Sequence, residues 1–315
     1  MTIQDDLNRH PIREQVLRAI AANREPGYHF CGNFLGIASF GMESGDGLLL
    51  ETGAHCADAD GQAHIGAVAV LADLALALSV RAVVNDSVRL ATVSLNLQFT
   101  GLARTGRLEA VSGFEGFFQQ AAGRQGLARV SLASDAGQVC FGSGAFMVMP
   151  TPAGMVLPVA PWGGAQAAGL PSLRESDLRE DEAWILRHAG AALETARETR
   201  TSFLDHFLGY TPQRVSGGAT CTMQNGPHVA NRVGHVQGGI QLGLAAVTAS
   251  AALPAGWTLS GMSACYLKPG EGEALTADSH IIHQGRHTAV VRTRVCGGGR
   301  QMLEVTTTHA AQEHP

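Results

Sequence analysis

Two glycine-led apolar stretches, GQAHIGAVAVLADLALALSVRAVV (61–84) and GHVQGGIQLGLAAVTASAAL (234–253), decide the fold of this 315-residue chain. The runs that begin at Gly66 and Gly239 are apolar on almost every side. A helix at a protein surface carries apolar residues on one face only, so this pattern predicts two helices that are buried all round. Each buried helix needs other parts of the chain to cover it, and this requirement sets the architecture around it.

The two stretches belong to an internal repeat with a constant offset of 173 residues. Residues 34–66 align with 207–239 without a gap, and nine of the 33 positions are identical. A long fixed period indicates a duplicated unit, so the sequence predicts two copies of one domain. The identical pairs are Phe34/Phe207, Leu35/Leu208, Gly36/Gly209, Gly45/Gly218, Gly53/Gly226, His55/His228, Ala57/Ala230, Gly61/Gly234 and Gly66/Gly239.

Strand-like sequence follows each apolar helix. In ATVSLNLQFT (91–100), apolar and polar residues alternate with a period of two, which is typical of a strand with one buried face. A buried helix followed by antiparallel strands predicts an α+β layer in each copy. Further strands are expected at 106–115, 127–134 and 138–149, with counterparts at 257–268, 273–284, 288–296 and 301–310.

The stretch between the copies, residues 150–171, is rich in Pro, Gly and Ala and predicts a linker that crosses the surface. A helical pattern over 176–207 leads into the second copy, and residues 12–24 form its shorter counterpart. We therefore expect an N-terminal domain over residues 1–150, a linker over 151–175 and a C-terminal domain over 176–315.

The composition excludes several classes of protein. The net charge of −5 gives no electrostatic attraction for nucleic acid or an anionic membrane. The N-terminus lacks the features of a signal peptide, and charged residues interrupt the most apolar stretch, so we expect no membrane-spanning segment. Six scattered cysteines without a CxxC pair indicate reduced thiols and a cytoplasmic protein. The spacing of the 13 histidines predicts no metal site.

Each buried helix begins with the same pattern, [Asp/Asn]-x-x-Gly-x-x-[His/Gln]-x-Gly. Glycines at a helix start leave backbone N–H groups uncovered, and the helix dipole helps these donors to bind a carbonyl oxygen or an oxyanion. A tight turn with a helix cap would produce the same pattern in one copy, but its presence in both copies favours a reaction site. The residues are Asp58, Gly61, His64 and Gly66 in the first copy and Asn231, Gly234, Gln237 and Gly239 in the second.

One carboxylate, Asp73, lies inside the first apolar helix. An unpaired carboxylate in such a place is strongly destabilising, so Asp73 either functions in a site or is held by a hydrogen-bond network. Its counterpart at the 173-residue offset is Ala246. Only one copy therefore holds the acid.

These residues resemble a known family. The pattern Gly-x-x-His-x-Gly (61–66), with Asp73 inside LADLA (71–75) and the strand TVSLNLQF (92–99), is similar to hotdog-fold thioesterases of the PaaI type. The resemblance covers most of the chain as two hotdog domains in tandem. It implies a long central helix wrapped by an antiparallel β-sheet in each domain, and hydrolysis of an acyl-CoA thioester to a free acid and CoA.

The resemblance also implies the partners. The substrate is a small acyl-CoA molecule, no cofactor is expected because CoA is part of that substrate, and the pseudo-dimeric chains are expected to form a homo-oligomer. Candidates for contacts with the CoA phosphates are Arg104, Arg124, Lys268 and Arg286.

The family's roles fall on particular residues of this chain. Asp73 would be the nucleophile or general base, and Gly66 or Gly239 would polarise the thioester carbonyl; Asp58 replaces the family's usual Asn, and Gln237 replaces its usual His. Asp73 lies about 10 Å beyond Gly66 along its own helix, at 1.5 Å per residue, so it cannot contact a carbonyl held at that helix start. Active sites in the resembled family are shared across a dimer, so the resemblance implies that Asp73 faces the other copy in a pseudo-twofold pair with antiparallel central helices. The predicted catalytic residues are Asp73, Asn231, Gln237, Gly238 and Gly239, and the second site, with Asp58, His64 and Gly66, lacks its carboxylate and is expected to be degenerate.

Two other functions stay open at this point. A non-catalytic acyl or acyl-CoA binding protein would have the same fold, and a hotdog dehydratase acting on 3-hydroxyacyl thioesters would need a histidine and a carboxylate that converge. The sequence leaves the acyl specificity and the choice between nucleophile and general base open.

Overall fold

The computed structural model describes residues 10–25, 30–42, 45–84, 88–120, 123–151, 170 and 173–312. The N-terminal half contains α2 (Pro11–Asn23), α3 (Phe30–Phe34), β1 (Ala38–Met42), β2 (Gly45–Glu51), α4 (Ile65–Arg81), β3 (Val88–Phe99), β4 (Arg107–Gln120), β5 (Gly123–Ser134) and β6 (Gly137–Pro150). The C-terminal half contains η1 (Glu175–Asp177), α6 (Glu180–Thr199), α7 (Phe203–Leu208), β7 (Gln213–Val215), β8 (Gly218–Gln224), α8 (Gly238–Ala252), β9 (Trp257–Tyr266), β10 (Ala274–Gln284), β11 (Thr288–Gly297) and β12 (Arg300–Ala311).

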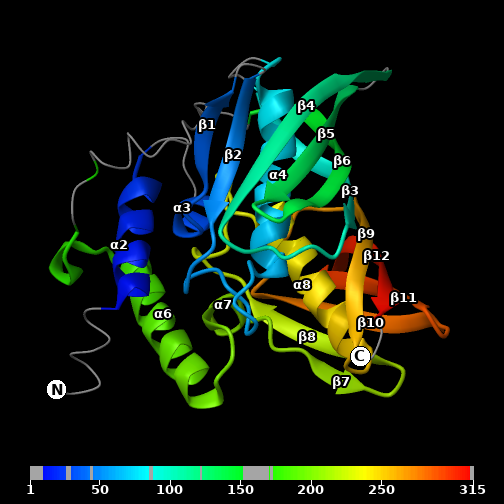
Figure 1. Ribbon diagram of the computed structural model, residues 1–315. Helices are drawn as coiled ribbons and strands as arrows, with labels where there is room; N and C mark the ends of the chain where they lie inside the picture. Colours follow the sequence, from blue (N-terminus) through cyan, green and yellow to red (C-terminus); the bar gives the residue numbers. More distant parts are fainter. Residues whose placement is uncertain are drawn as a thin grey trace.

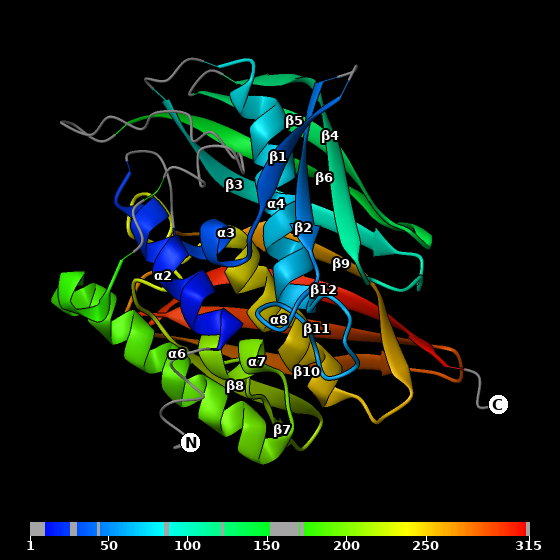
Figure 2. The ribbon, with the colours of Figure 1, turned by 60° about the vertical axis from the view of Figure 1, so that its left-hand side comes forward.

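The strands of both halves form one antiparallel sheet of 12 strands, in the order β1-β2-β4-β5-β6-β3-β9-β12-β11-β10-β8-β7. The halves join where β3 pairs with β9, from Ser94 opposite Cys265 to Gln98 opposite Gly261. The sheet curves around α4 and α8, which lie side by side inside it (Figures 1 and 2). Each half is thus a central helix wrapped by antiparallel strands, as the sequence predicts.

The two central helices cross at very short range. A Cβ atom added to Gly239 would lie 2.5 Å from Val70 Cα, and one added to Gly243 would lie 2.7 Å from Gly66 Cα. Because residue numbers rise along one helix as they fall along the other at these contacts, α4 and α8 run antiparallel. Only glycine permits so close an approach. Asp73, three residues beyond Val70, therefore lies opposite the loop that precedes Gly239.

Several identities in the repeat have conformational or packing reasons. Gly61 and Gly234 have φ angles of +75° and +82°, which L side chains rarely adopt. The rings of Phe34 and Phe207 contact each other with their centroids 4.8 Å apart. Residues that a twofold axis relates can touch only near that axis, so this repeated phenylalanine marks the junction of the two copies.

The helical pattern over 176–207 forms two helices, α6 and α7, instead of one continuous helix. Arg200 ends α6 in the left-handed region with a φ of +56°, and the Ser202 hydroxyl accepts a hydrogen bond from Leu204 N–H to begin α7. The Thr-Arg-Thr-Ser run supplies side-chain oxygens that compete with helical hydrogen bonds, which is the physical reason for the break.

Helix α2 agrees with the helix expected at 12–24, and it packs against α6 outside the sheet (Figure 1). Most of the predicted linker lies outside the described residues, at 152–169 and 171–172. The expected domain boundaries therefore stay a prediction. None of the helices in the described parts of the chain is long and apolar enough to span a membrane.

We predict that Gly243→Ala destabilises the protein. The added methyl group meets the Gly66 backbone at 2.7 Å and the Tyr210 hydroxyl at 2.8 Å, so the helices must move apart, with a loss of about 1–3 kcal/mol in the free energy of unfolding. Urea denaturation measures this loss. Gly190→Ala in α6 is the matched control, because nothing lies within 4 Å of its added methyl group. Equal stability of the two variants would contradict the proposed close crossing.

Candidate active site

The loop before α8 is held in shape by Asn231. Its side-chain oxygen accepts hydrogen bonds from the backbone N–H groups of Val233 (3.0 Å) and His235 (3.1 Å), and Gly234 makes the tight turn between them. Asp58 does the same in the first copy, where its Oδ1 accepts from Asp60 and Gln62. The repeated Asp/Asn-x-x-Gly pattern is thus a loop-forming motif.

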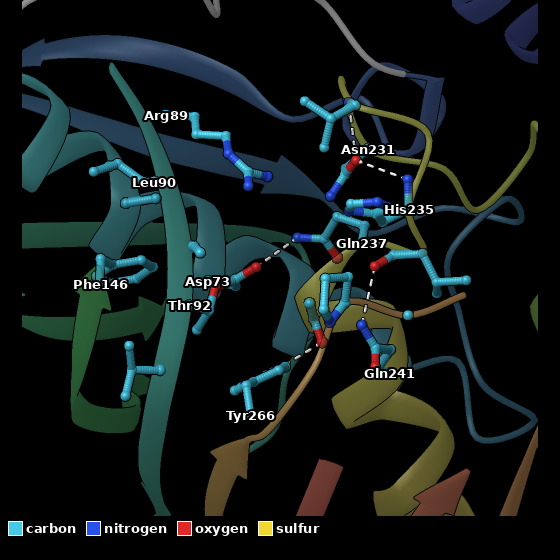
Figure 3. Close-up of a pocket in the computed structure, with 18 of the residues that line it drawn as sticks. Asp73, Arg89, Leu90, Thr92, Phe146, Asn231, His235, Gln237, Gln241 and Tyr266 are labelled. Carbon is cyan, nitrogen blue, oxygen red and sulfur yellow. Dashed lines mark hydrogen bonds between the residues drawn. The ribbon is translucent and has the colours of Figure 1, made fainter. Parts of the chain in front are cut away.

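Gln237 joins the two copies at the start of α8. Its Oε1 accepts from the Ile240 N–H at 2.9 Å and caps the helix, while its Nε2 donates to Asp73 Oδ2 at 2.7 Å (Figure 3). The capping bond fixes which end of the amide faces Asp73. Gln237 therefore presents a donor, and never an acceptor, to the carboxylate.

Asp73 receives further hydrogen bonds. The Thr92 hydroxyl donates to its Oδ1 at 3.0 Å, and the Gly239 N–H also donates to the carboxylate. Burial raises the pKa of Asp73 to about 6, and these three donors oppose the rise without cancelling it. A buried carboxylate that titrates near neutrality and touches a helix N-terminus is suited to acid–base or nucleophilic chemistry.

A cavity of about 400 Å³ opens beside this carboxylate. Asn231, Gln237 and Gly238 line it together with Asp73, so the residues predicted from the sequence for the first site come together here. Gly239 lies directly behind Gly238 and contributes its N–H. The volume is near the lower end of the range for small-molecule sites.

Two lining residues of this site are absent from the sequence-based prediction. Thr92 bonds to Asp73, and the Tyr266 hydroxyl donates to the Gly238 carbonyl at 2.8 Å. Thr92 lies within β3 and Tyr266 ends β9, the strands that follow the central helices, but strand alternation alone does not indicate that these side chains turn towards the site. Tyr266 holds the orientation of the peptide group that begins α8.

The second predicted site has a different environment. His64 Nδ1 accepts from the Gly66 N–H at 3.0 Å, so its proton is on Nε2, which donates to Asp205 Oδ1 at 2.9 Å. The Tyr210 ring stacks on His64 and lies over Gly66, and its hydroxyl donates to the Ile240 carbonyl. The N–H of Gly66 is therefore already bonded, and Ala246 supplies no carboxylate.

Of the four candidate CoA contacts, only Lys268 lines the cavity. Arg104 donates to Asp58 and to the Ala63 carbonyl and so holds the first-copy loop. Arg124 lies over the Phe117 ring, 4.3 Å from its centroid, and Arg286 is exposed in the turn between β10 and β11. These three arginines therefore do not line this cavity.

Three other cations do line the cavity: Arg81, Arg89 and Arg232. Arg81 had a signal in the sequence, because Asp73, Ala77 and Arg81 are spaced by four residues and share one face of α4. No sequence pattern indicated Arg89 or Arg232, because one lies on a strand and the other in a loop of the other copy.

We predict a pH-dependent stability difference between wild type and Asp73→Asn. The pKa of Asp73 is raised from 3.8 to about 6, so the folded state binds this proton more tightly than the unfolded state does. The carboxylate therefore destabilises the fold progressively as pH rises through this window, whereas asparagine does not ionise. Relative to the variant, wild type should lose roughly 2–3 kcal/mol of unfolding free energy from about pH 4 to 7, as measured by urea denaturation. A pH-independent difference would contradict the raised pKa.

Comparisons with known proteins bear on the fold. No protein-family model matches the sequence, and no curated protein matches it either. Among solved structures, a Lactobacillus plantarum protein described as an oleoyl thioesterase is 12% identical, with 89% of this chain and 100% of that chain covered and a TM-score of 0.51. A Novosphingobium aromaticivorans protein described as a thioesterase is 14% identical, with 88% and 99% covered and a TM-score of 0.51. The chain therefore has the tandem hotdog fold of these thioesterase structures, with two copies of the hotdog domain in one polypeptide.

Proposed function

We propose that this protein is an acyl-CoA thioesterase with one active site, at Asp73. The observation that carries the proposal is the buried Asp73 carboxylate, which touches Gln237 and the N-terminus of α8 at the edge of a cavity. The solved thioesterases of the same fold support the reaction class.

The start of α8 would bind the thioester carbonyl. Backbone N–H groups at a helix N-terminus stabilise the oxyanion that forms when the carbonyl carbon becomes tetrahedral, a contribution of about 3 kcal/mol. The Gly239 N–H now donates to Asp73. When substrate enters, its carbonyl oxygen would take this donor, and the carboxylate would then face the carbonyl carbon.

Asp73 can act by two routes. As a general base, it takes a proton from water, the water oxygen adds to the carbonyl carbon, and the C–S bond breaks to release CoA, which takes up a proton. As a nucleophile, it displaces the CoA thiolate to form a mixed anhydride that water then hydrolyses. Gln237 does not titrate, so it orients the carboxylate in either route, and the proton steps fall on Asp73.

Contacts of the histidine weigh against the dehydratase. That reaction needs a histidine and a carboxylate directed at one substrate, but both ring nitrogens of His64 are already in hydrogen bonds, to Gly66 and Asp205. Asp73 has the amide of Gln237 as its neighbour in place of a histidine. A measurement of acyl-CoA hydrolysis distinguishes a hydrolase from a binding protein, because only the hydrolase turns its ligand over.

We predict that Asp73→Asn lowers kcat for acyl-CoA hydrolysis by at least about a hundredfold, because it removes the base or nucleophile. Thiol release from octanoyl-CoA measures this. The wild-type kcat/KM should rise with pH through about 6, where the carboxylate forms. Asp135→Asn, at an exposed turn, is the control and should hydrolyse like wild type. Retained hydrolysis in Asp73→Asn would refute the assignment.

We also predict one ligand per chain. The site at Gly66 is covered by Tyr210 and lacks a carboxylate, so it should not bind the thioester. Calorimetric titration of Asp73→Asn with octanoyl-CoA, which this variant should not consume, measures the stoichiometry. Two equivalents per chain would show that the second site is still competent.

A further inference from the structure

The cavity beside Asp73 is strongly cationic in an acidic protein. Four cationic side chains line it, and Asp73 is the one carboxylate among its described lining residues, whereas the chain as a whole carries a net charge of −5. The cationic residues are Arg81, Arg89, Arg232 and Lys268. Such a concentration of positive charge favours an anionic group in the bound molecule.

Arg81 and Arg89 lie together at one end of the cavity. Arg81 is two helical turns beyond Asp73 on the same face of α4, about 12 Å along the axis. Its Nη1 donates to the Val88 carbonyl at 2.7 Å, which brings the guanidinium to the start of β3, next to Arg89. Helix α4 therefore sets the separation between the two arginines and Asp73, beside which the thioester carbonyl would bind.

Two of these cations, Arg89 and Arg232, are partly withdrawn from solvent. The Nε of Arg89 is buried and has no hydrogen-bond partner within the part of the chain that the structure describes. Burial lowers the pKa of Arg232, and the nearby charge of Arg81 lowers it further. A bound anion would offset the cost of this desolvation and would give the Arg89 Nε a charge-assisted hydrogen bond.

On the side of the site away from Arg89, the Gln241 side chain offers a neutral hydrogen-bond acceptor. Gln241 donates to the Val236 carbonyl at 3.0 Å, but its buried Oε1 accepts no hydrogen bond from the described residues. Figure 3 shows Arg89 and Gln241 on opposite sides of the hydrogen bond between Asp73 and Gln237. A thioester also extends in two directions from its carbonyl. The pantetheine arm carries amide N–H groups that suit Gln241, which leaves the arginine side for the acyl chain.

Size supports the same assignment. The pantetheine arm separates the sulfur from the first phosphate by a length comparable to four or five extended residues, ~15 Å, whereas the backbones of Asp73 and Arg81 are separated by about 12 Å along the helix axis. A cavity of about 400 Å³ also leaves little room for a nucleotide beside an acyl group. A chain of several carbons therefore fits between Asp73 and the arginines in less space than a pantetheine arm with its nucleotide requires.

We infer that Arg81, Arg89 and Arg232 select acyl thioesters whose acyl chain ends in a carboxylate, the monothioesters of dicarboxylic acids. Between Asp73 and the arginines, the methylene groups would pack on an apolar wall that includes Leu74, Leu78 and Phe146. This inference rests on the proposed thioesterase function and adds its substrate class.

The test compares substrates that differ only at the chain end. Suberoyl-CoA and octanoyl-CoA are hydrolysed by wild type, Arg89→Met and Arg129→Met, and the same acyl groups are offered as N-acetylcysteamine thioesters, which lack phosphates. Arg129 is the matched control because it pairs with Glu115 on β4 and its side chain is 75% exposed. Thermal melts check that the variants fold, and Arg232→Met replaces Arg89→Met if the latter does not.

We expect wild type to prefer suberoyl over octanoyl thioesters in kcat/KM. Arg89→Met should lower this preference about tenfold or more with both carriers, because one charge-assisted hydrogen bond is lost, and Arg129→Met should retain it. The inference is overturned if wild type prefers octanoyl thioesters. It is also overturned if Arg89→Met slows both CoA thioesters equally and leaves the N-acetylcysteamine thioesters unaffected, since the arginines would then bind a CoA phosphate.

Calorimetry with the free acids separates this inference from the proposed function. If no thioester is hydrolysed but suberate binds wild type more tightly than octanoate, and Arg89→Met loses the difference, the anion site stands and the thioesterase proposal fails. If octanoyl-CoA is hydrolysed and suberate shows no preferential binding, the thioesterase proposal stands and the inference fails.

Discussion

The close antiparallel crossing of α4 and α8 is the constraint on which the rest of the structure depends. Gly239 and Gly243 let the two backbones approach to a distance at which a side chain on α8 would clash with α4. This crossing sets the middle of one helix against the N-terminus of the other. It brings Asp73 to Gln237.

The same crossing produces two related environments that have diverged. One has Asp73, Gln237 and a cavity, and the other has Ala246 and a tyrosine ring over the helix start. In a homodimer each substitution would appear in both sites. Because the two copies belong to one chain, one environment keeps a buried carboxylate, which destabilises the fold, while the other is filled by Tyr210 and a hydrogen bond from His64 to Asp205.

Much of the fold could be predicted from local patterns. The all-round apolar runs indicated the central helices within a residue or two of their N-terminal ends. The strand-like stretches indicated β3–β6 and β9–β12, but β1, β2, β7 and β8 were not predicted. The prediction of one helix over 176–207 was wrong in one respect, since side-chain oxygens at 199–202 divide this stretch into α6 and α7. For the site, the pairing of Asp73 with the opposite helix start was predicted from helix geometry together with the family resemblance, whereas Asn231 owes its place in the repeat to the loop that it forms.

The sequence by itself determined that the chain is a duplicated α+β unit and that only one copy carries a carboxylate in its helix, because periodicity and identity are local properties of the residues. Only the tertiary structure decided which polar groups surround that carboxylate. The surrounding groups come from two strands and a loop, in different copies: Thr92, Tyr266, Arg89 and Arg232. The separation of these residues in the sequence does not indicate how far apart they lie in space. The charge of the cavity is a sum over such residues, so it emerges only when the chain folds.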